Sequence, residues 1–197
     1  MLSNLDKYLL PIKEYLDKIY EVDEEILLNY FSYWKEENYP AKTILTAAGE
    51  TQKVMYFILE GVQKSYQIAN SKEHIIEFTY FPSFSGIPDS FLTQTPSKYY
   101  LETISKTRLI KISYEKHQEL MIQYREIETL FRKLTELILF SIIDRHYEQI
   151  SLDMKSRFIS NLNKRPELLN LVSQKDLASY LNIDPTNLSK LINSVKI

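Results

Sequence analysis

The sequence predicts an α+β protein in which helices flank a small antiparallel β-barrel or sandwich and two short helices end the chain. Three patterns predict it: short β-type runs between about residues 40 and 113, a long helical stretch over residues 114–150, and two capped helices within residues 172–192. With 197 residues, 44% of them hydrophobic and 25% charged, the chain can build one or two domains with real cores.

Two N-terminal helices are expected, over residues 3–19 and 23–38. Their apolar residues recur at helical spacing: Leu5, Tyr8, Leu9, Ile12, Leu16 and Ile19 in the first, and Ile26, Leu27, Tyr30, Phe31 and Trp34 in the second. Pro11 has no backbone N–H and must disturb the first turns. The acidic residues 23–25 suit the positive end of the second helix.

Six short strands are expected next. They are Thr43–Leu45, Val54–Leu59, Val62–Ile68, His74–Tyr80, Tyr99–Ile104 and Arg108–Ile112, with turns at Gly49-Glu50 and Glu60-Gly61. Within the fourth strand, Ile76, Phe78 and Tyr80 alternate onto one face. The segment between the fourth and fifth strands reads as irregular. Strands this short, joined by turns, indicate a small antiparallel barrel or sandwich.

Residues 114–150 read mostly as one long helix with a broad apolar seam. The seam comprises Ile127, Leu130, Phe131, Leu134, Leu137, Ile138 and Ser141, and continues through Ile142 and Ile143. Packing against the barrel explains one side of it, and the remaining side predicts that two copies of the helix pair in parallel. A further helix over residues 152–163 is expected to turn Met154, Phe158, Ile159 and Leu162 inward.

The last stretch has the spacing of two short helices and a tight turn. Ser173 can cap the first helix, and Asp176 can return the bond as in a capping box. Asp184 is a second N-cap, followed by Pro185 at the first helical position. Asn182 stands where such turns usually carry Gly, and Asn tolerates the left-handed backbone.

Apolar residues of both helices fall on facing sides: Leu177, Ala178 and Leu181 in the first, and Leu188, Leu191 and Ile192 in the second. Ala178 is small where the helices would cross. This pattern predicts a helix-turn-helix whose second helix enters a DNA major groove. An ordinary helical hairpin that binds nothing is the alternative interpretation.

Charge is distributed unevenly. Residues 1–151 hold 17 Lys/Arg and 22 Asp/Glu, a net of −5, whereas residues 152–197 hold 7 and 4, a net of +3. The two-helix stretch therefore lies in the basic part, as phosphate neutralisation requires. Because the excess is small, affinity for DNA is expected to depend on two copies.

Several classes of protein are disfavoured. The chain has no cysteine, which excludes disulfides and thiolate sites. His74, His117 and His146 have no metal-ligand spacing, so no metal site and no enzyme activity are expected. No apolar run is long enough to span a membrane and no signal-peptide pattern is present, so a cytoplasmic location without membrane association is expected.

The order of barrel, long helix and two-helix motif resembles the Crp/Fnr family of bacterial transcription regulators. The likeness covers nearly the whole chain and is strongest in Arg165-Pro166-Glu167-Leu168-Leu169, residues 174–181 and residues 184–190. It is most similar to short Bacteroidetes members, which carry a segment like Ser90-Phe91-Leu92-Thr93. The resemblance implies a cyclic-nucleotide-binding-type β-barrel (a jelly roll), a homodimer through the long helix, and a two-fold operator.

The resemblance also implies base-reading positions at Thr186, Ser189 and Lys190. Asn187, read as exposed on the same helix, is added because its amide suits adenine, while Lys190 suits guanine. Ser173 and Gln174, at the start of the preceding helix, complete the predicted DNA-contacting set. The family more often has Arg where Lys190 stands. The chain ends at Ile197, which predicts a winged-helix-like fold whose wing is short or absent.

In cyclic-nucleotide-binding relatives a Gly-Glu pair and an Arg hold the ribose and phosphate. Here the predicted effector pocket is formed by Gly86, Ile87, Ser97, Lys98 and Tyr99. Ile87 stands where the Glu should be, and Ser97 or Lys98 stands where the Arg should be. Because a buried phosphate needs charge-assisted partners, this site reads as degenerate, with cAMP and cGMP disfavoured.

The chain is therefore expected to have three parts: a sensor domain over 1–115, a dimerisation helix over 116–150 and a DNA-binding domain over 151–197. The predicted function is that of a dimeric, sequence-specific transcription regulator that binds double-stranded palindromic DNA. It would contact RNA polymerase if it activates, requires no cofactor, and has an effector still to be identified. The alternative is an effector-binding module that has lost specific DNA binding.

Overall fold

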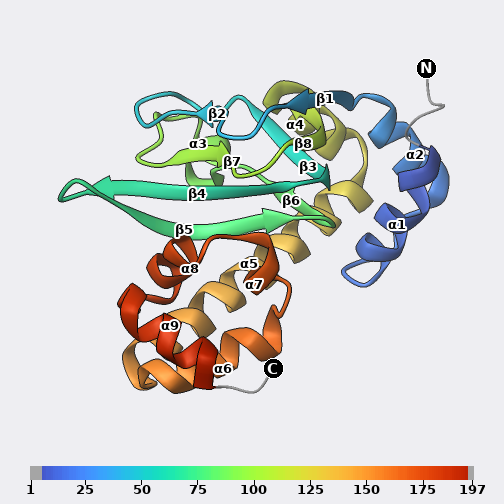
Figure 1. The fold of residues 1–197 in the computed structure, drawn as a ribbon. Coiled ribbons are helices and arrows are strands. Elements are labelled where there is room, and N and C mark those ends of the chain that lie inside the picture. Colours follow the sequence, from blue (N-terminus) through green and yellow to red (C-terminus); the bar gives the residue numbers. More distant parts are fainter. Residues whose placement is uncertain (1–5, 195–197) are drawn as a thin grey trace.

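Eight strands form two antiparallel four-stranded sheets in the computed structural model, which describes residues 6–194 (Figure 1). One sheet has the order β1-β8-β3-β6 and the other β2-β7-β4-β5. The strands are β1 (Lys35–Tyr39), β2 (Ile44–Thr46), β3 (Val54–Glu60), β4 (Val62–Ala69), β5 (Lys72–Tyr80), β6 (Ser83–Ser85), β7 (Tyr100–Thr103) and β8 (Thr107–Ser113). The strand pairing gives two separate sheets, which agrees with the sandwich of the two predicted alternatives and does not show a closed barrel.

The turns follow local backbone chemistry. Gly61, between β3 and β4, has φ +90°, and a Cβ there would lie 2.5 Å from the carbonyl oxygen of Lys106, so only glycine fits. Asn70 and Ser71, between β4 and β5, both have positive φ, as the two central residues of a tight hairpin turn require. The predicted alternation in β5 is correct for Phe78, which is buried, and wrong for Ile76, which is exposed. Ile75 is buried in its place because the β4–β5 register shifts there.

The second helix is shorter than predicted. α1 (Asp6–Asp17) and α2 (Glu24–Ser32) form, but α2 ends six residues before the predicted end at residue 38, and β1 begins at Lys35. Trp34 lies beyond the end of α2 but is still buried in the core. A tight turn holds it there, in which the N–H of Trp34 donates to Phe31 O at 3.1 Å. β6 and α3 (Pro88–Thr93) lie in the segment predicted to be irregular, and both are too short to show a periodicity.

The predicted long helix is divided. α4 (Tyr114–Gln123) and α5 (Arg125–Ser151) are separated by Tyr124, whose φ of −120° and ψ of 106° are extended. α1, α2, α4, the first part of α5 and β3 enclose one core that contains Ile12, Leu27, Phe57, Leu120 and Ile127. Figure 1 shows α1 and α2 at one end of the sheets and α5 running away from them beneath β5.

The C-terminal helices pack against β5 in a second core. They are α6 (Met154–Lys164), α7 (Leu168–Leu171), α8 (Gln174–Leu181) and α9 (Pro185–Ser194). Phe158, Leu177 and Leu188 are buried together with Ile75 and Phe78 of β5. Of the residues expected to point inward from α6, Phe158 is buried, but Met154 and Ile159 remain 43% and 36% exposed, because Met154 begins the helix and Ile159 lies about 100° around it from Phe158.

His117 lies inside the first core. Its side chain is 2% exposed, its Nδ1 is 2.9 Å from the hydroxyl of Tyr30, and its ring packs edge-on against Phe131. Burial lowers the pKa of His117 to about 4, so the ring is neutral at pH 7.

We expect the free energy of unfolding to fall when the pH is lowered from 7.5 to 5. The folded-state pKa of His117 lies below its ordinary value of 6.5, so the unfolded chain binds the extra proton and stability is lost as pH falls through that window. This group alone accounts for about 2 kcal/mol at pH 5. Denaturant titrations of wild type and His117→Gln at both pH values test this, since the variant should lose that part of the difference. An unchanged pH dependence in the variant would contradict the assignment.

Candidate functional site

Both predicted helix caps of the C-terminal region are formed. The hydroxyl of Ser173 accepts a hydrogen bond of 3.0 Å from the backbone N–H of Asp176 at the start of α8. The carboxylate of Asp184 accepts bonds of 2.9 and 3.2 Å from the N–H groups of Thr186 and Asn187 at the start of α9. These bonds satisfy helix-end donors and fix where each helix begins. Residues 173–194 are called the two-helix unit below.

The turn between the helices also follows the sequence. Asn182 adopts the left-handed conformation with φ 52°, and its N–H closes the end of α8. Ala178 is fully buried where α9 packs, which explains why a small residue is needed there. The two-helix unit is thus rigidly defined by local chemistry on both sides of a single left-handed residue.

The predicted DNA-contacting residues differ in exposure. Thr186 and Lys190 are exposed on α9, and Ser189 is half-buried beside Lys190. Asn187 was predicted to be exposed, but it is half-buried and its amide faces the sulfur of Met154 on α6 at 3.9 Å. Asn187 is therefore turned toward its own chain.

Ser173 and Gln174 are exposed at the other end of the two-helix unit. The hydroxyl of Ser173 is engaged in the cap of α8, whereas the Gln174 side chain extends from the first turn of that helix.

Positive charge around the two-helix unit comes from three exposed lysines, Lys155, Lys175 and Lys190, which form no ion pair within residues 6–194. Other cations of this region are used inside the molecule. Lys164 pairs with Glu148 at 2.8 Å, and Arg165 pairs with Glu77. The surface available to an anionic partner is therefore only weakly basic in one copy of the chain.

Two polar contacts fasten the two-helix unit to β5. The hydroxyl of Ser179 on α8 donates to Glu73 O at 3.0 Å and accepts from the N–H of Ile75 at 3.1 Å. Because β5 is an edge strand, these bonds satisfy backbone groups that no neighbouring strand reaches.

The guanidinium of Arg165 forms more hydrogen bonds between β5 and α8 than Ser179 does. It donates to the carboxylate of Glu77, to Phe78 O at 2.6 Å, and to the hydroxyls of Tyr80 and Tyr180 at 3.2 Å each. Three of these partners belong to β5 and one to α8. Sequence patterns gave no indication of this site, because the Arg165–Glu77 pair spans 88 residues.

The five residues of the predicted effector pocket do not form a charged site. Ile87 is a core residue, 2% exposed, packed among apolar side chains of both sheets. Ser97 is buried, and its hydroxyl is engaged by the backbone of Tyr99, at 2.8 Å to the N–H and 2.9 Å to the carbonyl oxygen. Lys98 is exposed, and Gly86 faces the amide of Gln52.

A set of buried neutral polar side chains inside the sandwich was not predicted. Thr46 donates to Gln52 at 2.6 Å, and Ser85 donates to the amide oxygen of Gln63 at 2.5 Å. Gln63 is 0% exposed, and its amide nitrogen has no hydrogen-bond partner. Gln63 lies between Val62 and Lys64, both of which are also buried. The sequence therefore shows no alternation of polar and apolar residues here that would have marked Gln63 as an interior residue.

The apolar seam of α5 is divided between two environments. Ile127, Leu130, Phe131 and Leu134 are buried in the core of their own chain, so they are not available as the pairing surface that was predicted. The remaining predicted interface residues are at the surface: Leu137 and Ile138 are 49% and 42% exposed, and Ser141 is exposed.

A second apolar stripe on α5 faces away from the molecule. Leu139, Ile142, Ile143 and Ile150 are each more than half exposed. Their spacing places them on one side of the helix, next to the buried seam rather than on it. Monomeric proteins rarely expose a contiguous apolar surface of this kind.

Two absences concern the described residues only. Among residues 6–194, no group of three or more His, Asp or Glu side chains is placed to hold a metal ion. In the same part of the chain, no helix has both the length and the apolar character needed to cross a bilayer.

Comparison with known proteins places the sandwich in a recognised family of domains. Residues 36–124 match the cyclic nucleotide-binding domain. The match runs from β1 to just past the end of α4, and confirms the predicted domain type for this part of the chain. No curated protein sequence matches the chain.

Solved structures share the fold over most of the chain. The c-di-GMP responsive global regulator CLP of Xanthomonas campestris is 17% identical and has a TM-score of 0.66, over 87% of this chain and 90% of that one. FixK2 of Bradyrhizobium japonicum is 15% identical, with a TM-score of 0.70 over 81% and 83%. The catabolite activator protein of Thermus thermophilus is 14% identical, with a TM-score of 0.57 over 89% and 84%.

We expect that cAMP at millimolar concentration will not raise the melting temperature. Ile87 is packed in the core, and Ser97 and Lys98 offer no buried cation to a phosphate. A ligand at a hundred times its dissociation constant would stabilise the folded state by about 2.7 kcal/mol. Thermal unfolding with and without cAMP measures this directly. A saturable increase of that size would contradict the expectation.

Proposed function

We propose that this chain is a dimeric DNA-binding transcription regulator of the Crp/Fnr type, whose sensor domain responds to something other than cAMP or cGMP. The two-helix unit carries the proposal: two capped helices cross closely at Ala178 and leave Thr186 and Lys190 exposed. The cyclic nucleotide-binding domain and the long helix before this unit support the same function.

In this proposal α9 enters the major groove as the recognition helix of a helix-turn-helix. Lys190 and Thr186 present their side chains to base edges from successive turns, and Ser189 lies beside Lys190. Ser173, Gln174 and Lys175, at the start of α8, are suited to phosphate contacts. Asn187 is withdrawn from the predicted set, because its amide faces Met154.

Lys190→Ala is expected to weaken binding to a selected operator. If Lys190 reads a base, discrimination between operator and scrambled DNA falls by about 1–3 kcal/mol for each base pair that the variant no longer reads. If it binds only phosphate, binding weakens equally on all sequences and the salt slope decreases. The measurement is fluorescence anisotropy on both DNAs at several salt concentrations.

Lys18→Ala is the control, because Lys18 is also an exposed lysine but directly follows α1, at the other end of the molecule from α9 (Figure 1). If Lys190→Ala and wild type bind both DNAs with equal affinity, the proposal that α9 enters the major groove is wrong. Binding by wild type with no preference for any sequence would favour the alternative, an effector-binding module that has lost specific DNA recognition.

The outward stripe of α5 is the proposed dimer interface. One copy brings three exposed lysines toward DNA, so two copies joined through α5 double the number of phosphate contacts. Leu139, Ile143 and Ile150 repeat at intervals of four and seven residues, which suits pairing of two parallel helices. This assignment replaces the buried seam at residues 127–134.

Ile143→Asp is expected to convert the dimer to a monomer. The new carboxylate would face its own symmetry mate in an apolar interface, where an unpaired charge is strongly unfavourable. Ile122→Asp is the control, because Ile122 is 86% exposed on α4, outside the stripe. Sedimentation velocity distinguishes the species. A dimer that persists in Ile143→Asp would place the interface elsewhere on the molecule.

The sensor domain is proposed to have lost the phosphate site of its relatives. Lys64 is the one Lys or Arg among residues 6–194 that is buried in the sheets, and it pairs with Glu73 at 2.6 Å. The interior instead offers neutral groups such as Gln63 and Ser85. Those groups suit a less anionic effector, or a purely structural domain. No cofactor is required, and RNA polymerase is a partner only if the protein activates.

A further inference from the structure

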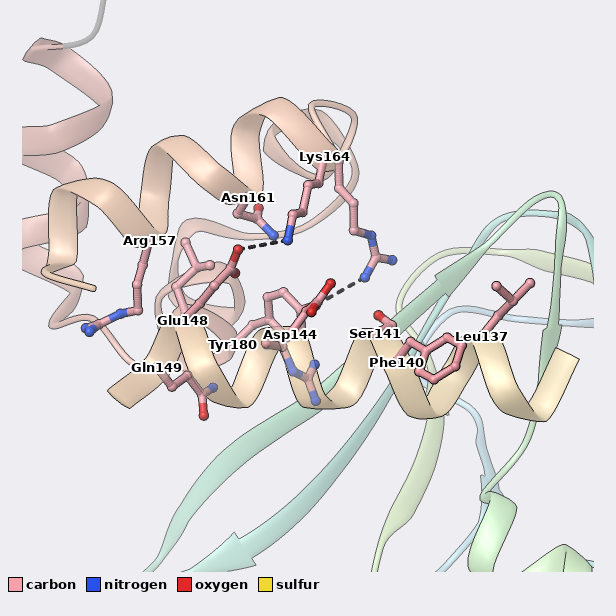
Figure 2. A pocket seen from close by; sticks show the side chains of 13 residues that line it. Leu137, Phe140, Ser141, Asp144, Glu148, Gln149, Arg157, Asn161, Lys164 and Tyr180 are labelled. Carbon is pink, nitrogen blue, oxygen red and sulfur yellow. Dashed lines mark hydrogen bonds and ion pairs between the residues drawn. The ribbon is translucent and has the colours of Figure 1, made fainter. Parts of the chain in front are cut away.

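A cavity of about 340 Å³ lies between α5 and the C-terminal helices. α5 forms one wall, α6 and the residues after it form a second, and Tyr180 and Leu181 at the end of α8 form the third. Figure 2 shows Asn161 and Lys164 of α6 and Tyr180 of α8 near Glu148 of α5. The volume is in the range of small-molecule sites. Nothing in the sensor or DNA-binding roles uses this cavity.

The charged side chains that line the cavity are mostly cations. Four of them are Arg145, Arg157, Lys164 and Arg165, against the two carboxylates of Asp144 and Glu148. Lys164 forms an ion pair with Glu148 at 2.8 Å and has N–H groups to spare. Glu77 lies outside the lining but pairs with both Arg145 and Arg165, so the excess is one cation, which favours a ligand with a single negative charge.

Within residues 6–194, Arg145 and Arg157 each keep guanidinium N–H groups that form no hydrogen bond with the protein. Arg145 uses only Nη1, toward Ile76 O and Glu77, and its guanidinium lies 5.0 Å from the ring centre of Tyr180. Arg157 uses both terminal nitrogens, but its Nε is buried without a partner. The Nε of Arg157 is too enclosed to reach a ligand, so an anion in the cavity would use the remaining N–H groups of Lys164 and Arg145.

The two ends of the cavity differ in character. Asn161 and Lys164 line one end from α6. Leu137 and Phe140 line the other end, from an earlier part of α5 than the remaining lining residues, as Figure 2 shows. Leu137 and Phe140 are 49% and 59% exposed, so a ligand body that covers them removes apolar surface from water. The cavity therefore suits a molecule with an anionic end and an apolar end.

The cavity stays open when a second copy docks on the proposed stripe. Ser141 and Glu148 line the cavity and are seven residues apart, so they share a face of α5. Ile143 and Ile150 of the stripe each follow them by two residues, which is about 200° around the helix. Cavity and dimer interface thus occupy nearly opposite sides of α5.

We propose that this cavity binds a small organic anion: an apolar or aromatic body that carries one carboxylate or phosphate group. The anionic group lies beside Lys164 and Asn161, and the body covers Leu137, Phe140 and the ring of Tyr180. Since the ligand contacts α5, α6 and α8 together, it fixes the position of the two-helix unit on α5. An effect on DNA affinity rests on the proposed function, but the binding itself does not.

The test is isothermal titration calorimetry of the full chain with four probes: 2-naphthyl phosphate, 2-naphthoate, neutral 2-naphthol and inorganic phosphate. We expect saturable binding of at least one naphthyl anion, one molecule per chain. 2-Naphthol and inorganic phosphate should bind at least about tenfold more weakly, because each lacks one of the two matched groups. The tighter of the two naphthyl anions identifies the preferred charged group.

Two variants locate the site. Ser141→Trp should abolish binding by filling the cavity, and Lys164→Gln should weaken it by roughly fivefold or more. Lys155→Gln is the matched control, an exposed lysine on the same helix outside the cavity, and should leave binding unchanged. The proposal is wrong if neither naphthyl anion binds, if 2-naphthol or inorganic phosphate binds as tightly as they do, or if both cavity variants bind like wild type. Calorimetry uses no DNA, so failure of the regulator proposal would leave these results intact.

Discussion

The guanidinium of Arg165 is the contact on which the arrangement of the two halves depends. It joins α8 to β5 through Glu77, Phe78 O and two tyrosine hydroxyls, and burial raises the pKa of one of these, Tyr180, which keeps that phenol protonated as an acceptor. An Arg fork suits such a set of fixed acceptors, whereas Lys could not reach them all. With Ser179 on the same edge strand, it holds the two-helix unit in one position relative to the sheets.

The helix α5 links this contact to the rest of the molecule, because each side of α5 faces a different environment. Its first turns bury Ile127 and Leu130 under the sandwich, and Arg145 further along reaches β5 beside Arg165. The outward stripe with Ile143 stays exposed, and the cavity opens on another side. The core, the exposed stripe and the cavity therefore all lie on one continuous helix.

Features that depend on residues close in sequence could be predicted, and they include much of the fold and part of the site. Contacts between residues distant in sequence could not be predicted. The caps at Ser173 and Asp184 and the left-handed Asn182 were all predicted, because each depends on residues within a few positions. Periodicity showed that α5 is apolar on several sides, but it could not say which side meets the core. The Arg165 contact and the buried amide of Gln63 depend on partners that only the fold brings close.

Hydrogen exchange of Arg165→Gln tests most directly whether this one side chain holds the two-helix unit on the sheets. We expect amides of β5 and α8 to exchange at least about tenfold faster, since a hydrogen bond to a charged group contributes roughly 1.5–3 kcal/mol. Strands β3 and β8 should stay protected, and Arg132→Gln, an exposed change on α5, should behave like wild type. Unchanged protection of β5 and α8 in Arg165→Gln would contradict the account.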